Sequence, residues 1–111
     1  MLNCLVVAGR LVKNPEFKES KEVKYATFSI AVETGKEETS FFDCIAPEYC
    51  LKGLELCHKG DKIAVEGYLR QRRFKTKEGK ETSAIQIVVD HLEFIDVKKV
   101  EEEKPSEEAP F

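Results

Sequence analysis

The sequence contains no tryptophan, a single methionine and two histidines in 111 residues. No apolar stretch approaches the about 18 residues that a membrane-spanning helix needs. An apolar segment behind a basic start, which is typical of a secretory signal, is also missing. We therefore expect a cytoplasmic protein whose thiols stay reduced.

Cysteine and histidine form no ligand pattern. The four cysteines include no C-x-x-C pair, and the two histidines complete no zinc-binding spacing with them. We therefore predict no metal site and no cofactor. Since free cysteine usually behaves as a small apolar residue, we expect these four in the core: Cys4, Cys44, Cys50 and Cys57.

Catalytic patterns are lacking as well. The chain has no G-x-S-x-G, no phosphate-cradling glycine loop and no H-E-x-x-H. His58 stands beside a helix stop and His91 in an apolar strand, while Glu37 and Glu38 lie in a turn without a neighbouring general acid. The sequence therefore does not predict an enzyme.

The charge is unevenly distributed along the chain. The net charge of −3 argues superficially against binding of nucleic acid, because phosphates attract basic side chains. Residues 98–111 carry three lysines against five glutamates, and residues 1–97 carry 15 basic against 16 acidic residues. Within this near-neutral part, Arg70–Lys80 holds six basic residues against one glutamate, a net charge of +5. Basic charge is thus concentrated in one segment.

The length suits one domain followed by a tail. We place the domain at residues 1–97. Residues 98–111 show no apolar pattern able to fold back, so we expect a disordered acidic tail. Its tip joins an acidic run to a proline and a terminal aromatic residue, which suits docking into a basic pocket of a partner: Glu107, Glu108, Ala109, Pro110 and Phe111.

Three strands are predicted in the first half of the chain. Leu2–Val12 is rich in β-formers, with Gly9 as a place for a bulge or bend. Lys24–Val32 alternates between apolar and mixed positions, and Gly35-Lys36 turns it into a third strand, Thr39–Ala46. The face of the second strand expected in the core carries Ala26, Phe28, Ile30 and Val32.

A short helix and two strands follow. Pro47 suits the first turn of a helix over Glu48–His58, which ends at Gly60. Lys62–Arg70 and Ala84–Val97 then read as strands. An all-β chain of five strands, with one helix between the third and fourth, has the order of an OB-fold barrel.

In that barrel the basic segment Arg70–Lys80 joins the last two strands, and such loops commonly contact oligonucleotides. Its first part interleaves cations with Phe74. Cations neutralise phosphates while a flat ring stacks on an unpaired base, so the pattern favours a site for single strands. The alternative is a solvated hairpin whose charges prevent aggregation at a sheet edge.

Other aromatic residues are ambiguous. Phe41 and Phe42 lie on opposite faces of one strand, and we favour Phe41 as the exposed stacking residue. Tyrosines 25, 49 and 68 could reach the groove but are more typical of a core edge, while phenylalanines 17, 28 and 94 are assigned a structural role.

Several stretches together strongly resemble bacterial single-stranded DNA-binding proteins. These are Asn3–Leu11 with Asn14-Pro15-Glu16, Phe28–Val32, Lys59–Arg70 and the tip Pro110-Phe111. The resemblance implies a protein that binds and protects single-stranded DNA in replication, recombination and repair. It also implies a homotetramer that pairs through first strands, a nucleoid association, and a tip that docks replication and repair enzymes.

By this resemblance, Phe41 and Phe74 match base-stacking positions, and Arg70, Arg72 and Arg73 match cations that contact the DNA backbone. The full set expected to bind DNA is Phe41, Phe74, Arg70, Arg72, Arg73, Lys75, Lys77 and Arg10.

The chain also departs from the family pattern. The hairpin at Gly35 is short and lacks an aromatic residue, Asp43 stands near a position usually held by a cation, and Pro47-Glu48 replaces an aromatic-glycine step. The long Gly-, Pro- and Gln-rich linker that the family places before the acidic tip is nearly missing. Residues 98–106 stand in its place and reach at most about 30 Å when extended.

Two rival readings remain. A primosomal replication protein of the same superfamily would bind DNA as a scaffold, but its relatives generally lack a Pro-Phe tip. A pure protein-interaction barrel would use its basic segment on an acidic partner.

Overall fold

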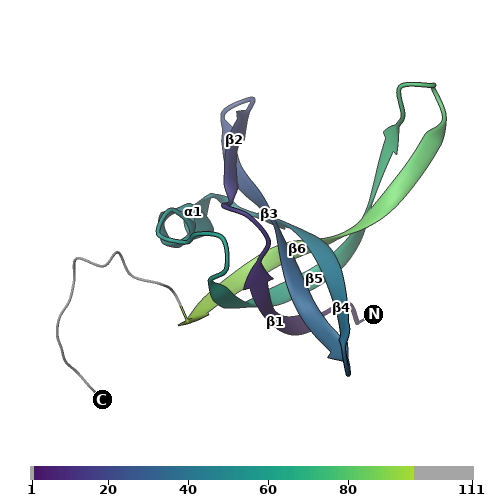
Figure 1. Cartoon of the computed structure of the whole chain (residues 1–111). Helices are drawn as coiled ribbons and strands as arrows, with labels where there is room; N and C mark the ends of the chain where they lie inside the picture. The colour runs from purple at the N-terminus through teal and green to yellow at the C-terminus, as the bar shows by residue number, and fades with distance from the viewer. Residues whose placement is uncertain (1, 97–111) are drawn as a thin grey trace, which may run out of the picture.

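The computed structural model describes residues 2–96, so the expected tail and its tip lie outside the described residues. Six strands form one sheet in the order β1-β5-β6-β4-β3-β2, and an additional pairing of β1 with β3 closes the sheet into a barrel (Figure 1). The prediction of a five-stranded OB-fold barrel is confirmed. The barrel strands are β1 (Leu5–Leu11), β3 (Val23–Gly35), β4 (Glu38–Ala46), β5 (Lys62–Lys75) and β6 (Glu81–Asp96).

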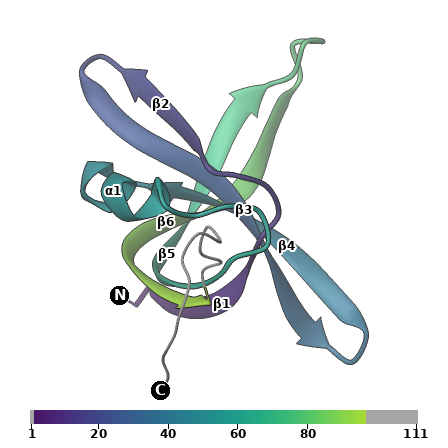
Figure 2. The same cartoon turned by 60° about the vertical axis from the view of Figure 1, so that its left-hand side comes forward.

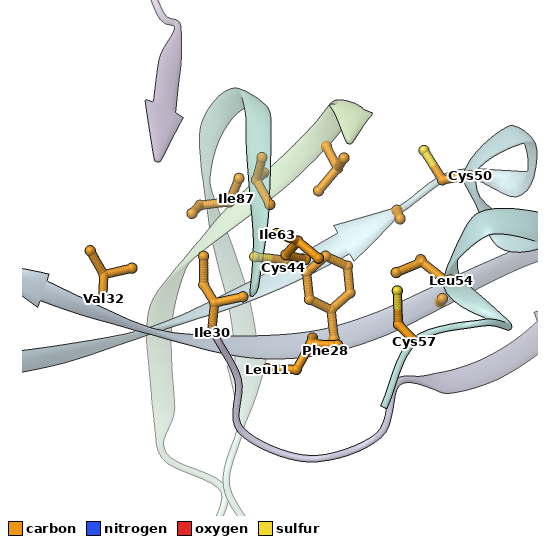
Figure 3. Close-up of a cluster of buried hydrophobic side chains, with 14 residues drawn as sticks. Leu11, Phe28, Ile30, Val32, Cys44, Cys50, Leu54, Cys57, Ile63 and Ile87 are labelled. Atoms are coloured by element: carbon orange, nitrogen blue, oxygen red, sulfur yellow. The ribbon is translucent and has the colours of Figure 1, made fainter. Parts of the chain in front are cut away.

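The alternation of β3 determines the core. Its inward side chains, at positions 26, 28, 30 and 32, are all buried, as the sequence predicted. Figure 3 shows Phe28 beside Ile63, with Leu54 and Cys57 approaching from the helical segment. Cys44 and Cys50 are buried as well, but Cys4 is exposed, so the expectation of four core cysteines is wrong for the first.

The helix lies between β4 and β5 as expected, but it is shorter than Glu48–His58. It consists of a 3-10 turn, η1 (Glu48–Cys50), followed by α1 (Leu51–Leu54). After α1 the backbone changes to tighter bonds, with Leu56 N donating to Gly53 O at 3.1 Å and Cys57 N to Leu54 O at 3.0 Å. The helical segment thereby covers one end of the barrel with Leu54, which is fully buried.

Two elements of the structure were missed. A short strand, β2 (Glu16–Ser20), forms a hairpin with the first half of β3, and all five of its residues are exposed. The basic segment is not a loop, because β5 continues to Lys75 and pairs with β6 as far as Glu81. Figure 2 shows three hairpins projecting from the barrel: β2–β3, β3–β4 and the β5–β6 ribbon.

The bulge expected at Gly9 lies elsewhere. The register of β1 with β5 is unbroken through Gly9, where a Cβ atom would stand 2.5 Å from the carbonyl oxygen of Ala31. Gly9 therefore permits the close approach of β1 and β3 that closes the barrel. The register shifts at Gly67 in β5, where a Cβ atom would stand 1.9 Å from the carbonyl oxygen of Val88.

Candidate nucleic-acid interface

An open cleft of about 340 Å³ lies over the outer face of β3 and β4, and residues of the β2–β3 hairpin and of the β5–β6 ribbon border it. Residues from β2 to β6 and from the β1–β2 connection line it, although the chain brings them from distant positions. Its charged side chains are four cations and two carboxylates: Lys13, Lys18, Arg70, Arg72, Glu16 and Asp43.

The alternation of β5 directs Arg70 and Arg72 into this cleft. Arg70 pairs in register with Gln86 of β6, and its Nη2 donates to Gln86 Oε1 at 2.8 Å. Two residues further on, the Arg72 guanidinium carbon lies 5.0 Å from the centre of the Phe74 ring, a cation–π contact. Arg70, Arg72 and Phe74 thus share one face of the ribbon.

Arg73 and Lys75 lie on the opposite face of the ribbon. They border a second hollow of about 400 Å³, which Gln71, Ser83 and Phe74 also line, whereas Phe74 does not line the cleft itself. Arg73 Nη2 donates to Gln71 Oε1 at 3.2 Å, which holds the guanidinium on this face. The sequence-predicted cations are therefore divided between two surfaces, and Lys77 lies in the turn at the tip of the ribbon.

Phe41 continues the outer face of the cleft along β4. Its ring is 66% exposed, whereas Phe42 is half-buried against the core, which is the orientation that the sequence favoured. Phe41 pairs with Ala31, and Ala31 pairs with Arg10 across the barrel closure. Because directly paired residues share a face, Arg10 and Phe41 belong to one cross-strand row. Arg10 is held by its Nη1, which donates to the Gly60 carbonyl oxygen at 2.9 Å.

The cations of the cleft differ in how far they are neutralised. Glu16 lies 3.2 Å from Lys13 and 3.7 Å from Lys18, and the hydrogen bond from Lys13 is the main cause that lowers the pKa of Glu16. Arg70 and Arg72 take part in none of the salt bridges within residues 2–96. The ribbon side of the cleft is therefore the side most available to a phosphate.

The other aromatic residues differ in burial. Phe28 is buried, whereas Phe17 and Phe94 are 47% and 42% exposed, and the Phe94 ring lies against Gly53 of α1. Tyr25 is half-buried and lines the cleft, while Tyr49 is 71% exposed and donates its hydroxyl to the Asp90 carbonyl oxygen at 2.9 Å.

Sequence reasoning also missed most of the polar residues that line the cleft, among them two lysines and a glutamine. Lys13 and Lys18 flank Glu16 at the unpredicted strand β2, and Gln86 lies on β6. Since β2 has no apolar alternation, the sequence carries no signal that would have placed Lys18 there.

The other titratable groups form no second site. Within residues 2–96, no group of three or more histidine, cysteine or carboxylate residues could hold a metal ion. Burial raises the pKa of Cys44 to about 12 and that of Cys57 to about 11, so both thiols stay protonated at neutral pH. In the same part of the chain, no helix is long and apolar enough to cross a membrane.

The fold and the cleft together define an OB-fold barrel with an open, partly basic face where such barrels bind oligonucleotides or oligosaccharides. Comparison with known proteins identifies the family. Residues 2–95 match the model of the single-strand binding protein family. The chain belongs to this family, which confirms the resemblance seen in the sequence.

Relatives include single-stranded DNA-binding protein 1 of Staphylococcus aureus, 29% identical over 92% of this chain. The single-stranded DNA-binding protein of Malacoplasma penetrans is 33% identical over 82% of this chain. The matches cover 66% and 50% of these relatives, so the chain spans less than two thirds of their length. The Plasmodium falciparum SSB complex with ssDNA has a similar fold, with a TM-score of 0.79 at 22% identity over 86% of this chain and 96% of that one.

Proposed function

We propose that this protein binds single-stranded DNA of any sequence and protects it during replication, recombination and repair. The observation that supports this most directly is the cleft, where Arg70 and Arg72 of β5 take part in no salt bridge within residues 2–96 and the exposed ring of Phe41 continues the same outer face along β4. Family membership supports the same conclusion. The protein catalyses no reaction; it acts by occupying the strand.

Binding combines two kinds of contact. Phe41 and Phe74 stack on bases, and each base–aromatic stack contributes about 1 to 3 kcal/mol. Arg70 and Arg72 neutralise phosphates, which releases counterions and makes affinity depend on salt. Neither contact reads a base edge, so the strand is held whatever its sequence.

The remaining cations guide the strand at the borders of this face. Arg73 and Lys75 extend the basic surface around the ribbon, and Lys77 lies at its tip. Arg10 stands at the other border, in the row of Phe41. A strand that runs from the Arg70 and Arg72 face of the ribbon across the cleft to Phe41 would also reach Arg10. Only a strand that wraps around the ribbon would meet Arg73, Lys75 and Lys77 as well.

We also propose a homotetramer assembled through β1. Within the described residues, β1 pairs with β3 at only two positions, Arg10 and Leu11, so Leu5–Gly9 has an edge without a strand beside it. A second copy of β1 would satisfy the backbone groups of this edge. Light scattering with and without an oligothymidine would give the mass and the stoichiometry; a monomer would contradict the assembly.

The division into a barrel of residues 1–97 and a docking tail of residues 98–111 belongs to this proposal. We expect residues 107–111 to recruit replication and repair enzymes in the nucleoid. Deleting these five residues should leave the affinity for oligothymidine intact while abolishing co-purification of such enzymes. Retained co-purification would show that the tip is not the docking element.

A titration tests the DNA-binding function itself. A labelled oligothymidine and a duplex of the same length are titrated by fluorescence anisotropy at two salt concentrations. We expect tight, salt-dependent binding of the single strand and much weaker binding of the duplex. Equal affinity for both forms would refute the proposal, and failure to bind any oligonucleotide would favour a protein-interaction barrel.

A further inference from the structure

The floor of the cleft carries a carboxylate where a negatively charged polymer is expected to bind. Asp43 lies on β4 beside Gln86 of β6 and opposite Ser29 of β3, and all three line the cleft. Its side chain is exposed. Unlike Glu16, Asp43 takes part in none of the salt bridges within residues 2–96. Its charge therefore faces whatever enters.

The carboxylate is held in one orientation. The Ser29 hydroxyl donates to Asp43 Oδ1 at 2.7 Å, across a directly paired position of β3 and β4. Within the described residues, the Asp43 side chain has no other hydrogen bond, so Oδ2 remains available as an acceptor. Because Oδ2 can accept a hydrogen bond but has no donor within residues 2–96, it favours ligands that carry an N–H or O–H group.

The place of Asp43 brings it within reach of a base rather than only of the backbone. Asp43 follows Phe41 by two residues on the same face of β4, a distance of about 7 Å along a strand. A base stacked on the Phe41 ring, or its neighbour in the strand, can present its edge to Oδ2. Arg70 and Arg72 line the cleft on its ribbon side, so phosphates are attracted there and not to the floor.

We propose that Asp43 gives this protein a preference for bases that carry an exocyclic amino group, superimposed on binding that tolerates any sequence. Cytosine, adenine and guanine each offer an amino donor to a carboxylate, as in the pairing of Asp or Glu with cytosine N4. Thymine offers a single ring N–H between two carbonyl oxygens, which a carboxylate repels. This inference rests on the proposed function, because it concerns the same cleft.

The test compares oligodeoxycytidine with oligothymidine of equal length, since both are pyrimidines. The dissociation constants are measured for the full chain and for Asp43→Asn, and the ratio of dT to dC values is taken for each protein. Taking the ratio of the two ratios cancels the intrinsic difference between the polymers. We expect the preference for dC to fall by about three- to tenfold in D43N, as for one lost hydrogen bond. Binding of dT should tighten, because a repulsive charge is gone.

Asp90→Asn is the matched control, because it changes the charge by the same amount at an exposed residue of β6 that does not line the cleft. The ratio of the dT to the dC dissociation constant for D90N should equal the ratio for the unchanged protein. A ratio unchanged in D43N, or shifted equally in D90N, would overturn the base preference while leaving DNA binding standing. Equal affinity of the unchanged protein for dT and duplex would instead remove the proposed function, and this inference with it.

Discussion

Replacing Phe41 by alanine tests whether the exposed ring of β4 is a stacking platform. The ring is 66% exposed, so about one third of the area that a buried phenylalanine would hide is at stake in folding. Burying a whole phenylalanine stabilises a protein by about 1.5 to 3 kcal/mol, which leaves about 0.5 to 1 kcal/mol here. Loss of one base stack costs about 1 to 3 kcal/mol of binding, which corresponds to an increase in Kd of about 5- to 150-fold.

The assay is a fluorescence anisotropy titration with oligothymidine, accompanied by a urea unfolding curve of the same variant. Phe17→Ala provides the control, because Phe17 is also an exposed phenylalanine, at 47%, but alternation places it on the opposite face of β2 from Glu16 and Lys18, which line the cleft. We expect F17A to bind as the unchanged protein does. Equal Kd values for F41A and the unchanged protein would refute the assignment of Phe41, and equal losses in F41A and F17A would show that the contact is not specific to the cleft.

Four further predictions follow from the same geometry. Phe74→Ala should weaken oligothymidine binding by about 1 to 3 kcal/mol, and an unchanged Kd would remove the ring from the site. The double variant R70A/R72A should reduce the slope of log K against log salt by about 1.4, since each phosphate contact of a single strand contributes about 0.7. The variant R73A/K75A, on the opposite face of the ribbon, should reduce this slope less. A larger reduction in R73A/K75A than in R70A/R72A would contradict the placement of the strand. Gly67→Ala should lower the free energy of unfolding by at least about 2 kcal/mol, because its Cβ would stand 1.9 Å from a backbone oxygen. The Cβ of Gly79→Ala would meet nothing within 4 Å and is strained only by the φ of +83°, so this variant should lower the free energy of unfolding by about 1 kcal/mol. Equal decreases for the two variants would disprove the clash at Gly67. A thiol reagent at pH 8 should modify one thiol per folded chain, Cys4, because Cys44, Cys50 and Cys57 are buried and burial raises the pKa of each, that of Cys44 to about 12 and that of Cys57 to about 11; rapid reaction of more than one thiol would contradict the packing of the core.

The barrel could be predicted from the sequence because its strands are amphipathic. The clean alternation from Ala26 to Val32 predicted both the strand and its buried face. Gly60 marked the break before β5, although the helix itself already ends at Leu54. β2 escaped because it is exposed along its whole length and is ordered only by pairing with β3. The full length of β5 was not predicted for a related reason. Arg70–Lys75 carries the charge typical of a loop, but its backbone pairs with β6.

The candidate site was only partly predictable. Interleaved cations and a ring in one segment indicated a surface for single strands, but a segment read as a loop does not show that Arg72 and Arg73 point to opposite faces. The sequence also could not predict which residues are neighbours across paired strands. The pairing of Asp43 with Ser29 and the row from Arg10 to Phe41 exist only once the barrel closes.

Mapping the bound strand on the protein tests the central claim most directly. Oligothymidine is added to the isotopically labelled protein, and the shifts of backbone amide signals are followed by NMR. We predict the largest shifts along the cleft face, at Tyr25, Phe41, Asp43, Arg72 and Phe74, with small changes on the far face of the barrel at Val6 and Glu66. Large shifts at Val6 and Glu66 with an unperturbed cleft would contradict the account.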